Sequence, residues 1–148
     1  MKKLFIILGC LTTMSFSIWQ PSFDKAKELA KEKNQLILLN FSGSDWCGPC
    51  IRMHREIFGN ESFSTMADTT LVMVNADFPR SKKNQLNKQQ QQQNDVLADK
   101  YNPEGKFPFT LLLDANGKIL QSWDGLPKED VATFTNLIKN KCDAYSKR

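Results

Sequence analysis

Three runs of apolar residues dominate the chain and predict strands, and the continuity of the first two predicts strands that are buried on both faces. They span residues 36–41, 71–74 and 107–113. The third run starts with Phe107-Pro108, a place where a strand tolerates the missing N–H of proline. Asn116-Gly117 then predicts a hairpin turn, with a partner strand over residues 118–123.

Apolar residues between and after these runs recur at helical spacing. Phe23, Ala26 and Ala30 share one face of a helix that begins at Pro21 or Ser22. A last helix begins at Pro127. The inward-facing residues predicted for the other helices are Ile51, Ile57 and Phe58 after the first strand, Val96 and Leu97 within residues 95–101, and Val131, Phe134 and Ile138 in the last helix, while a short helix over residues 60–66 is also expected.

Helices that alternate with parallel strands, followed by an antiparallel hairpin, predict an α/β fold. The expected architecture is a central mixed sheet flanked by helices. Residues 80–93 depart from this pattern, because they hold Lys82, Lys83, Lys88 and five consecutive glutamines, residues 89–93. Such a composition does not bury a core face. We predict a surface insertion, as a solvated loop or an exposed helical extension, with docking of a partner as the alternative.

Residues 1–17 have the pattern of a signal peptide. Lys2 and Lys3 precede an apolar stretch, and Ser15-Phe16-Ser17 is a small-x-small cleavage site. We therefore predict one domain over residues 18–148 in a periplasmic or secreted protein, where disulfides persist.

Cys10 allows a second interpretation of the N-terminus. Ile7-Leu8-Gly9-Cys10 loosely resembles a lipoprotein signal, in which the cysteine would carry a lipid anchor. The apolar stretch before it covers only residues 4–9, shorter than the usual h-region of about 7–15 residues. Cleavage after Ser17 is therefore favoured over a lipid anchor at Cys10.

The charge balance is nearly even. The chain has 20 Lys and Arg residues against 16 Asp and Glu, and two of the lysines lie in the predicted signal peptide. A domain with so small a net positive charge is not expected to bind nucleic acid.

Trp46-Cys47-Gly48-Pro49-Cys50 is the main candidate for chemistry, because it follows the first buried strand and opens a helix. A cysteine in the first helical turn lies near unpaired N–H groups and the positive end of the helix dipole, which favours its thiolate. A closed zinc site needs four ligands, and outside the signal peptide the chain adds only His54 and Cys142 to this pair. A purely structural disulfide would close too short a loop to constrain the unfolded chain much. The pattern predicts a redox dithiol of Cys47 and Cys50 that needs no metal or cofactor.

The chain also resembles the thioredoxin-fold family over nearly all of residues 18–148. The segments that carry the resemblance are Trp46-Cys47-Gly48-Pro49-Cys50, Val74-Asn75-Ala76-Asp77, Lys100-Tyr101, residues 107–113, Asn116-Gly117-Lys118 and Asp124-Gly125-Leu126. With its signal peptide, the chain is most similar to exported bacterial thioredoxin-like thiol–disulfide oxidoreductases. The resemblance implies a thioredoxin-like three-layer sandwich.

The resemblance also implies roles for five residues. Cys47 would attack a substrate disulfide, and Cys50 would resolve the mixed disulfide. Pro108 would follow a cis bond and pack against the dithiol, presenting the backbone of Phe107 for strand-like pairing with substrate. Trp46 would shield one side of the sulfurs.

Two positions depart from the family pattern. Asn40 stands where cytoplasmic thioredoxins carry a buried aspartate, and an amide has no titrating group. The dithiol helix lacks the proline that often kinks it in the family, so a straighter helix is expected.

Three functions are compatible with these residues. The leading one is reduction of protein or small-molecule disulfides by a monomer that a membrane or periplasmic electron donor recharges. The alternatives are Cu(I) handling through Cys47, Cys50 and His54, and a non-catalytic module that binds peptides at Phe107-Pro108. His54 is either a proton acceptor, a metal ligand or a half-buried helix residue, and Cys142 is expected to be a spectator.

Overall fold

A computed structural model of the protein describes residues 19–147 and contains one five-stranded mixed sheet in the order β1-β3-β2-β4-β5. The strands are β1 (Trp19–Gln20), β2 (Leu36–Ser42), β3 (Leu71–Asp77), β4 (Phe109–Leu113) and β5 (Ile119–Asp124). β1 and β2 run parallel to β3, β4 runs antiparallel to β2, and β5 runs antiparallel to β4. The predicted mixed sheet is confirmed. β1 was missed, because two residues carry no readable alternation.

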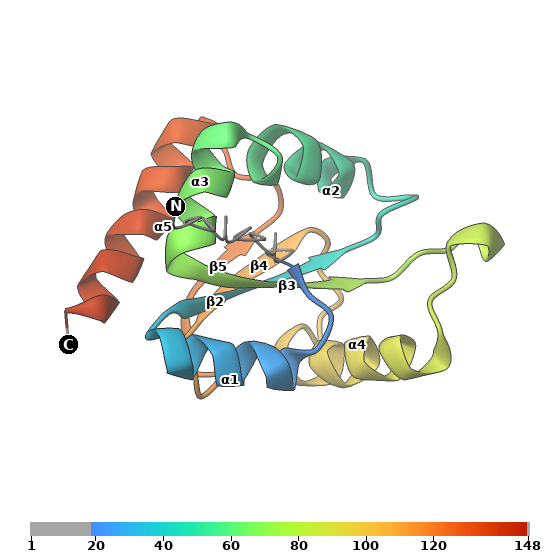
Figure 1. The fold of residues 1–148 in the computed structure, drawn as a ribbon. Helices are drawn as coiled ribbons and strands as arrows, with labels where there is room; N and C mark the ends of the chain where they lie inside the picture. The colour runs from blue at the N-terminus through green and yellow to red at the C-terminus, as the bar shows by residue number, and fades with distance from the viewer. Residues whose placement is uncertain (1–18, 148) are drawn as a thin grey trace, which may run out of the picture.

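Helices cover both faces of the sheet, which confirms the three-layer sandwich. They are α1 (Phe23–Lys33), α2 (Gly48–Arg52), the π-helix η1 (Met53–Phe58), α3 (Glu61–Thr70), the short 3₁₀ helix η2 (Lys82–Asn84), α4 (Lys88–Tyr101) and α5 (Val131–Ser146). α1 and α4 lie on one face, whereas α2, α3 and α5 lie on the other (Figure 1). The predicted signal peptide and Cys10 lie outside the described residues. Within residues 19–147, no helix combines the length and the apolar character that a membrane span requires.

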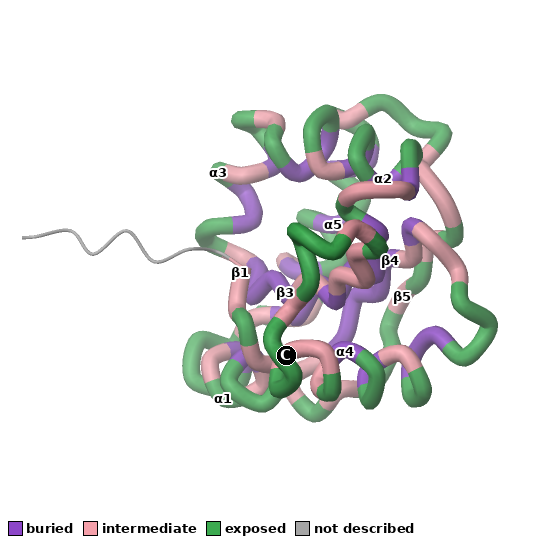
Figure 2. Tube along the Cα trace, turned by 90° about the vertical axis from the view of Figure 1, so that its right-hand side faces the viewer, coloured by how far each residue is buried: buried purple, intermediate pink, exposed green. Residues whose placement is uncertain are grey.

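β2 divides the core into two clusters, because successive side chains of a strand point to opposite faces. Leu36 and Leu38 pack with Phe63 and Phe134 beneath α3 and α5. The alternate residues of β2, among them Ile37, pack against the helices of the other face. All seven residues of β2 are buried, and Figure 2 shows buried residues gathered along the strands.

Side-chain caps set where the helices begin. The side chain of Asp130 accepts the N–H of Thr133 at 2.7 Å, so α5 starts at Val131 and the predicted start at Pro127 is wrong. Ser22 caps α1 in the same way, as the sequence predicted.

Two residues predicted to face inward are exposed. Ile51 is 42% exposed and Val96 is 60% exposed. α4 begins at Lys88, and its buried face follows Asn94, Leu97 and Tyr101, which leaves Val96 on the outer side. Ile51 follows the buried Cys50 and points out of the same turn.

The Lys/Gln-rich segment forms a connection and the first turns of α4. Its first half contains the turn η2, and the glutamine run, residues 89–93, lies in the first turns of α4, where Gln89 and Gln92 are exposed and the other three glutamines are half-buried. The Asn94 side chain donates to the backbone carbonyl of Asp77 at 2.8 Å, which ties α4 to the end of β3. The segment therefore combines the two predicted alternatives, a loop in its first half and a helical extension in its second half.

Truncation of Phe134 tests the core beneath α5. Its ring is fully buried and contacts the rings of Phe63 and Trp123. Phe134→Ala removes these contacts and leaves a cavity, so we expect the free energy of unfolding to fall by about 3–5 kcal/mol. Leu137→Ala on the same helix is the control, because Leu137 is 43% exposed. Equal losses for the two variants in urea titrations would contradict the packing described here.

Candidate dithiol active site

Cys47 and Cys50 lie at the start of α2, one helical turn apart, and are joined in a disulfide with a Cα–Cα distance of 5.2 Å. Cys47 is the N-cap residue, and its Sγ accepts the backbone N–H of Cys50 at 3.3 Å. An N–H group aimed at this sulfur stabilises a thiolate there once the disulfide is reduced. Cys47 is 5% exposed to solvent and Cys50 is fully buried, so the Cys47 sulfur is the more accessible of the two to a substrate.

Local backbone chemistry positions the pair at the carboxyl end of β2. The backbone N–H of Cys47 donates to the carbonyl of Gly43 at 2.9 Å, which closes the connecting loop. Pro49 lies in the first turn of α2, where a helix does not need the N–H that proline lacks. A side chain at Gly43 would meet the Trp46 ring, since a Cβ there would lie 2.2 Å from its Cε2 atom. Glycine at position 43 therefore allows the close approach of the Trp46 ring.

Trp46 and Phe107 lie in contact, with ring centroids 5.4 Å apart. The indole N–H of Trp46 donates to the carbonyl of Phe78 at 2.7 Å, which holds the ring in place. The Phe107-Pro108 peptide bond is cis, and Pro108 accepts the N–H of Gly125 at 2.9 Å. β4 starts just after Pro108, antiparallel to β2, so Phe107 and Pro108 lie at the edge where β2 delivers the dithiol.

A column of polar side chains fills the sheet face beneath this edge. Cross-strand neighbours in the sheet pair Asn40 with Asn75 and Thr110, and Ser42 with Asp77. Asn40 is fully buried; its amide donates to Asn75 at 2.9 Å and its carbonyl accepts from Thr110 at 3.0 Å. The Ser42 hydroxyl lies 3.2 Å from the carboxylate of Asp77. Asn40 and Ser42 lie on the same face of β2 as Leu36 and Leu38, so this face changes from apolar to polar toward the end of the strand.

His54 borders this column and shares a pocket with Cys50. The pocket measures about 400 Å³ and is lined by Ser44, Cys50, Ile51, His54, Arg55 and Asn75. The Asn40 amide nitrogen lies 3.4 Å from Nε2 of His54, a contact that suits an unprotonated Nε2 as acceptor. Burial lowers the pKa of His54, while Asn75 and the charge of Asp77 oppose the shift in part. His54 is thus half-buried and favours the neutral form.

The helix that carries His54 is not a regular α-helix. Residues Met53–Phe58 form a π-helix, and the N–H of Gly59 donates to the carbonyl of His54 at 2.8 Å, an i to i+5 bond. The wider turn buries Met53, Ile57 and Phe58 together. A straighter helix was expected because the kinking proline is missing, but the sequence did not predict the π-helical turn.

Among the described residues, neither a cluster of metal ligands nor the remaining thiol adds to the dithiol site. Within residues 19–147, no three His, Cys, Asp or Glu side chains gather as a metal site would require. Cys142 is buried on α5, and burial raises its pKa to about 11, so its thiol stays protonated near neutral pH. The thiol lies in the core cluster beneath α3 and α5, as expected for a spectator.

Sequence reasoning missed two carboxylates that hold the dithiol loop. Asp77 accepts the N–H and the hydroxyl of Ser44 at 2.8 and 2.6 Å. Asp45 accepts the backbone N–H groups of Arg80 and Ser81 at 2.9 and 2.8 Å. The alternation of Asn75 and Asp77 along β3 is a signal that could have indicated the first of these contacts, whereas no sequence signal indicates the second.

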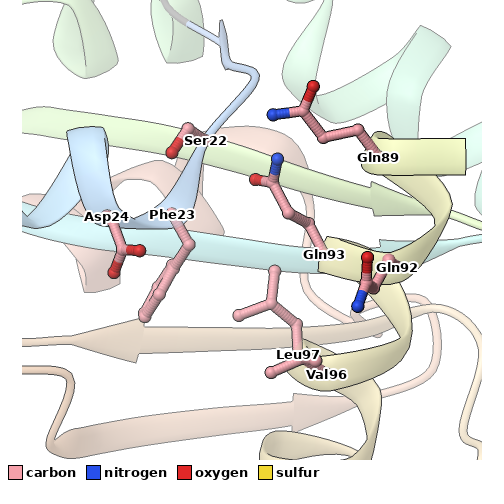
Figure 3. A pocket seen from close by; sticks show the side chains of 8 residues that line it. All are labelled: Ser22, Phe23, Asp24, Gln89, Gln92, Gln93, Val96 and Leu97. Carbon is pink, nitrogen blue, oxygen red and sulfur yellow. The ribbon is translucent and has the colours of Figure 1, made fainter. Parts of the chain in front are cut away.

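A larger pocket of about 470 Å³ lies away from the dithiol, between the start of α1 and α4 (Figure 3). Ser22, Phe23 and Asp24 line it from one side, and Gln89, Gln92, Gln93, Val96 and Leu97 from the other. Part of the glutamine run therefore borders a groove of its own, separate from the residues around Cys47.

A family model for thioredoxin-like proteins matches residues 18–115. The chain therefore belongs to the thioredoxin-like family. The sequence is 39% identical over 102 residues to the disulfide bond reductase DsbH of Chlamydia pneumoniae, covering 69% of this chain and 59% of that protein. It is 28% identical over 96 residues to the thioredoxin-related protein DsbJ of the same organism, covering 65% of this chain and 27% of that protein. The matches thus span less than two thirds of both relatives.

Solved structures agree with the fold. A structure of DsbH oxidoreductase superposes with a TM-score of 0.75 at 33% identity, covering 84% of this chain and 83% of that chain. A thioredoxin from Thermus thermophilus gives a TM-score of 0.61 at 15% identity, with 84% of this chain and 85% of that chain covered. The second likeness concerns the fold alone.

The depressed pKa of His54 predicts a pH dependence of stability. Between the folded pKa and the ordinary value near 6.5, the unfolded chain binds the proton and the folded chain does not. The free energy of unfolding should therefore fall as the pH drops through about 6.5 toward the folded pKa. Denaturant titrations at pH 7.5 and 5.5 should show a smaller loss for His54→Gln than for the unsubstituted protein. An equal loss in both proteins would rule out this contribution of His54.

Proposed function

We propose that the protein is a thiol–disulfide oxidoreductase that reduces disulfides, those of proteins foremost, through Cys47 and Cys50. The observation that carries the proposal is the position of the pair, with the Cys47 sulfur capping α2 and accepting the N–H of Cys50. A thiolate favoured in this way is the attacking species in disulfide exchange. The likeness to a protein named disulfide bond reductase supports reduction as the direction.

The reaction proceeds in two exchanges. The Cys47 thiolate attacks one sulfur of the substrate disulfide, the substrate S–S bond breaks, and the leaving sulfur takes up a proton. Cys50 then loses its proton and attacks the Cys47 sulfur of the mixed disulfide. The second substrate thiol leaves, and Cys47 and Cys50 remain in the oxidised form present in this structure.

Trp46, Phe107 and Pro108 are proposed to bind the substrate chain beside Cys47. Within the described part of the chain, the backbone N–H and C=O of Phe107 make no hydrogen bond to another backbone group. An extended substrate segment adds to such free backbone groups as an extra strand does. The rings of Trp46 and Phe107 give that segment an apolar wall.

Each turnover leaves a disulfide that an electron donor must reduce. Because the predicted signal peptide would export the protein to an oxidising compartment, the donor is proposed to be a membrane or periplasmic protein. The protein is proposed to act there as a monomer.

Cysteine variants test the two roles. Cys47→Ser should lower the rate of dithiothreitol-driven insulin reduction to that of dithiothreitol alone, because the attacking sulfur is gone. Cys50→Ser should trap a mixed disulfide between Cys47 and insulin, detected as a mass adduct that excess dithiothreitol removes. Cys142→Ala is the matched control and should keep full activity. A rate for Cys47→Ser close to that of the control would refute the assignment.

Export is tested by the mass of the processed protein. Expression in a bacterial host should release a soluble protein that begins at Ile18, because the small-x-small site ends at Ser17. Intact-mass analysis distinguishes this product from one with an acylated Cys10 at its N-terminus. Detection of the acylated product would contradict cleavage after Ser17 and would show that the protein is lipid-anchored.

A further inference from the structure

The connection from β3 to α4 is fastened to the dithiol loop. Asp45, two residues before Cys47, accepts the backbone N–H of Arg80 and of Ser81 and the side-chain amide of Asn84 at 2.9, 2.8 and 3.0 Å. These hydrogen bonds lower the pKa of Asp45 and keep it charged. The turn η2 is thereby held beside the loop that carries the dithiol, which Figure 1 shows at one end of the sheet.

Arg80 stacks on the tryptophan that adjoins Cys47. Its guanidinium carbon lies 3.7 Å from the centroid of the Trp46 ring. The stack fixes the plane of the guanidinium, while Arg80 remains an exposed residue. A planar guanidinium held in this way presents N–H groups that match the two oxygens of a carboxylate.

Lys82 and Lys83 follow Arg80 on η2, and both are exposed. Among residues 19–147, the ion pairs do not include Arg80, Lys82 or Lys83. The sequence has no acidic residue between positions 78 and 94. Asp45 and Asp77 are the facing carboxylates, because Asp77 binds Ser44 of the same loop, and together they offset two of the three positive charges. A net positive surface therefore lies beside Trp46, and we name Arg80, Lys82 and Lys83 the basic wall.

We infer that the basic wall binds carboxylate side chains of substrate proteins and selects disulfides whose reactive cysteine has acidic neighbours. This inference rests on the proposed reduction of disulfides and adds the class of substrate. A chain that lies across Trp46 and Phe107 brings its residues near the cysteine within reach of Arg80. Attraction between exposed charges of opposite sign raises the rate at which enzyme and substrate meet more than it strengthens the final complex.

Three disulfide-linked peptides of one length test the inference, with two glutamates, two glutamines or two lysines beside the target cysteine. The readout is kcat/KM for their reduction at low ionic strength. We expect the glutamate peptide to react at least tenfold faster than the lysine peptide, with the glutamine peptide between them. Added salt should reduce the ratio, because it screens exposed charges.

Matched variants locate the effect. Lys82→Gln with Lys83→Gln should reduce the ratio about threefold or more, and Arg80→Gln should reduce it similarly. Arg80→Lys keeps the charge but loses the planar fork, so it should keep only part of the preference. Lys31→Gln with Lys33→Gln removes two exposed lysines from the end of α1 and is the control for net charge.

The outcomes separate this inference from the proposed function. Equal rates for the three peptides, or a preference that survives Arg80→Gln combined with Lys82→Gln and Lys83→Gln, would overturn the inference alone. A loss of preference in the Lys31/Lys33 control as large as in the wall variants would also overturn it, because bulk charge would then be the cause. If none of the peptides is reduced, the proposed function itself fails.

Discussion

The burial of β2 on both faces is the constraint on which the rest of the structure depends. A strand enclosed between two helical layers must place each polar side chain where it finds a partner. β2 meets this condition by being apolar where α3 and α5 cover it and polar at Asn40 and Ser42, where β3 and β4 offer Asn75, Asp77 and Thr110. The strand therefore ends in a hydrogen-bonded layer, and the dithiol helix is built over that layer.

The same polar layer also supplies hydrogen bonds to the dithiol loop, which has no regular secondary structure. Asp77 at the end of β3 binds Ser44, and Asp45 in turn binds the chain that leaves β3. The two loops thus hold each other through one carboxylate from each side. Trp46 completes the contact, with its indole N–H on the carbonyl of Phe78. A redox site gains from such mutual support, because reacting groups on a fixed frame need little reordering when substrate arrives.

Much of this arrangement could be predicted from the sequence, and the reasons differ between elements. The strands and the dithiol helix were predictable because apolar runs and a cysteine motif carry strong local signals. β1 and the start of α5 were not, since two residues hold no periodicity and a cap by Asp130 outweighs the proline signal at Pro127. The contact of Arg80 with Trp46 depends on long-range hydrogen bonds that Asp45 accepts from the backbone of Arg80 and Ser81, and no local pattern encodes them.

Asn40 shows how one amide orders the inner side of the site. A carboxylate at this buried position could only accept hydrogen bonds, and its charge would cost solvation energy. The amide donates to Asn75, approaches Nε2 of His54 and accepts from Thr110 at the same time. The Asn40 carbonyl accepts from Thr110, so the amide nitrogen faces the imidazole. A donor at this position stabilises the neutral form of the buried ring. The layer beneath Cys50 is consequently uncharged at Asn40, Asn75 and Thr110, and burial lowers the pKa of His54 in the Cys50 pocket, which favours its neutral form as well.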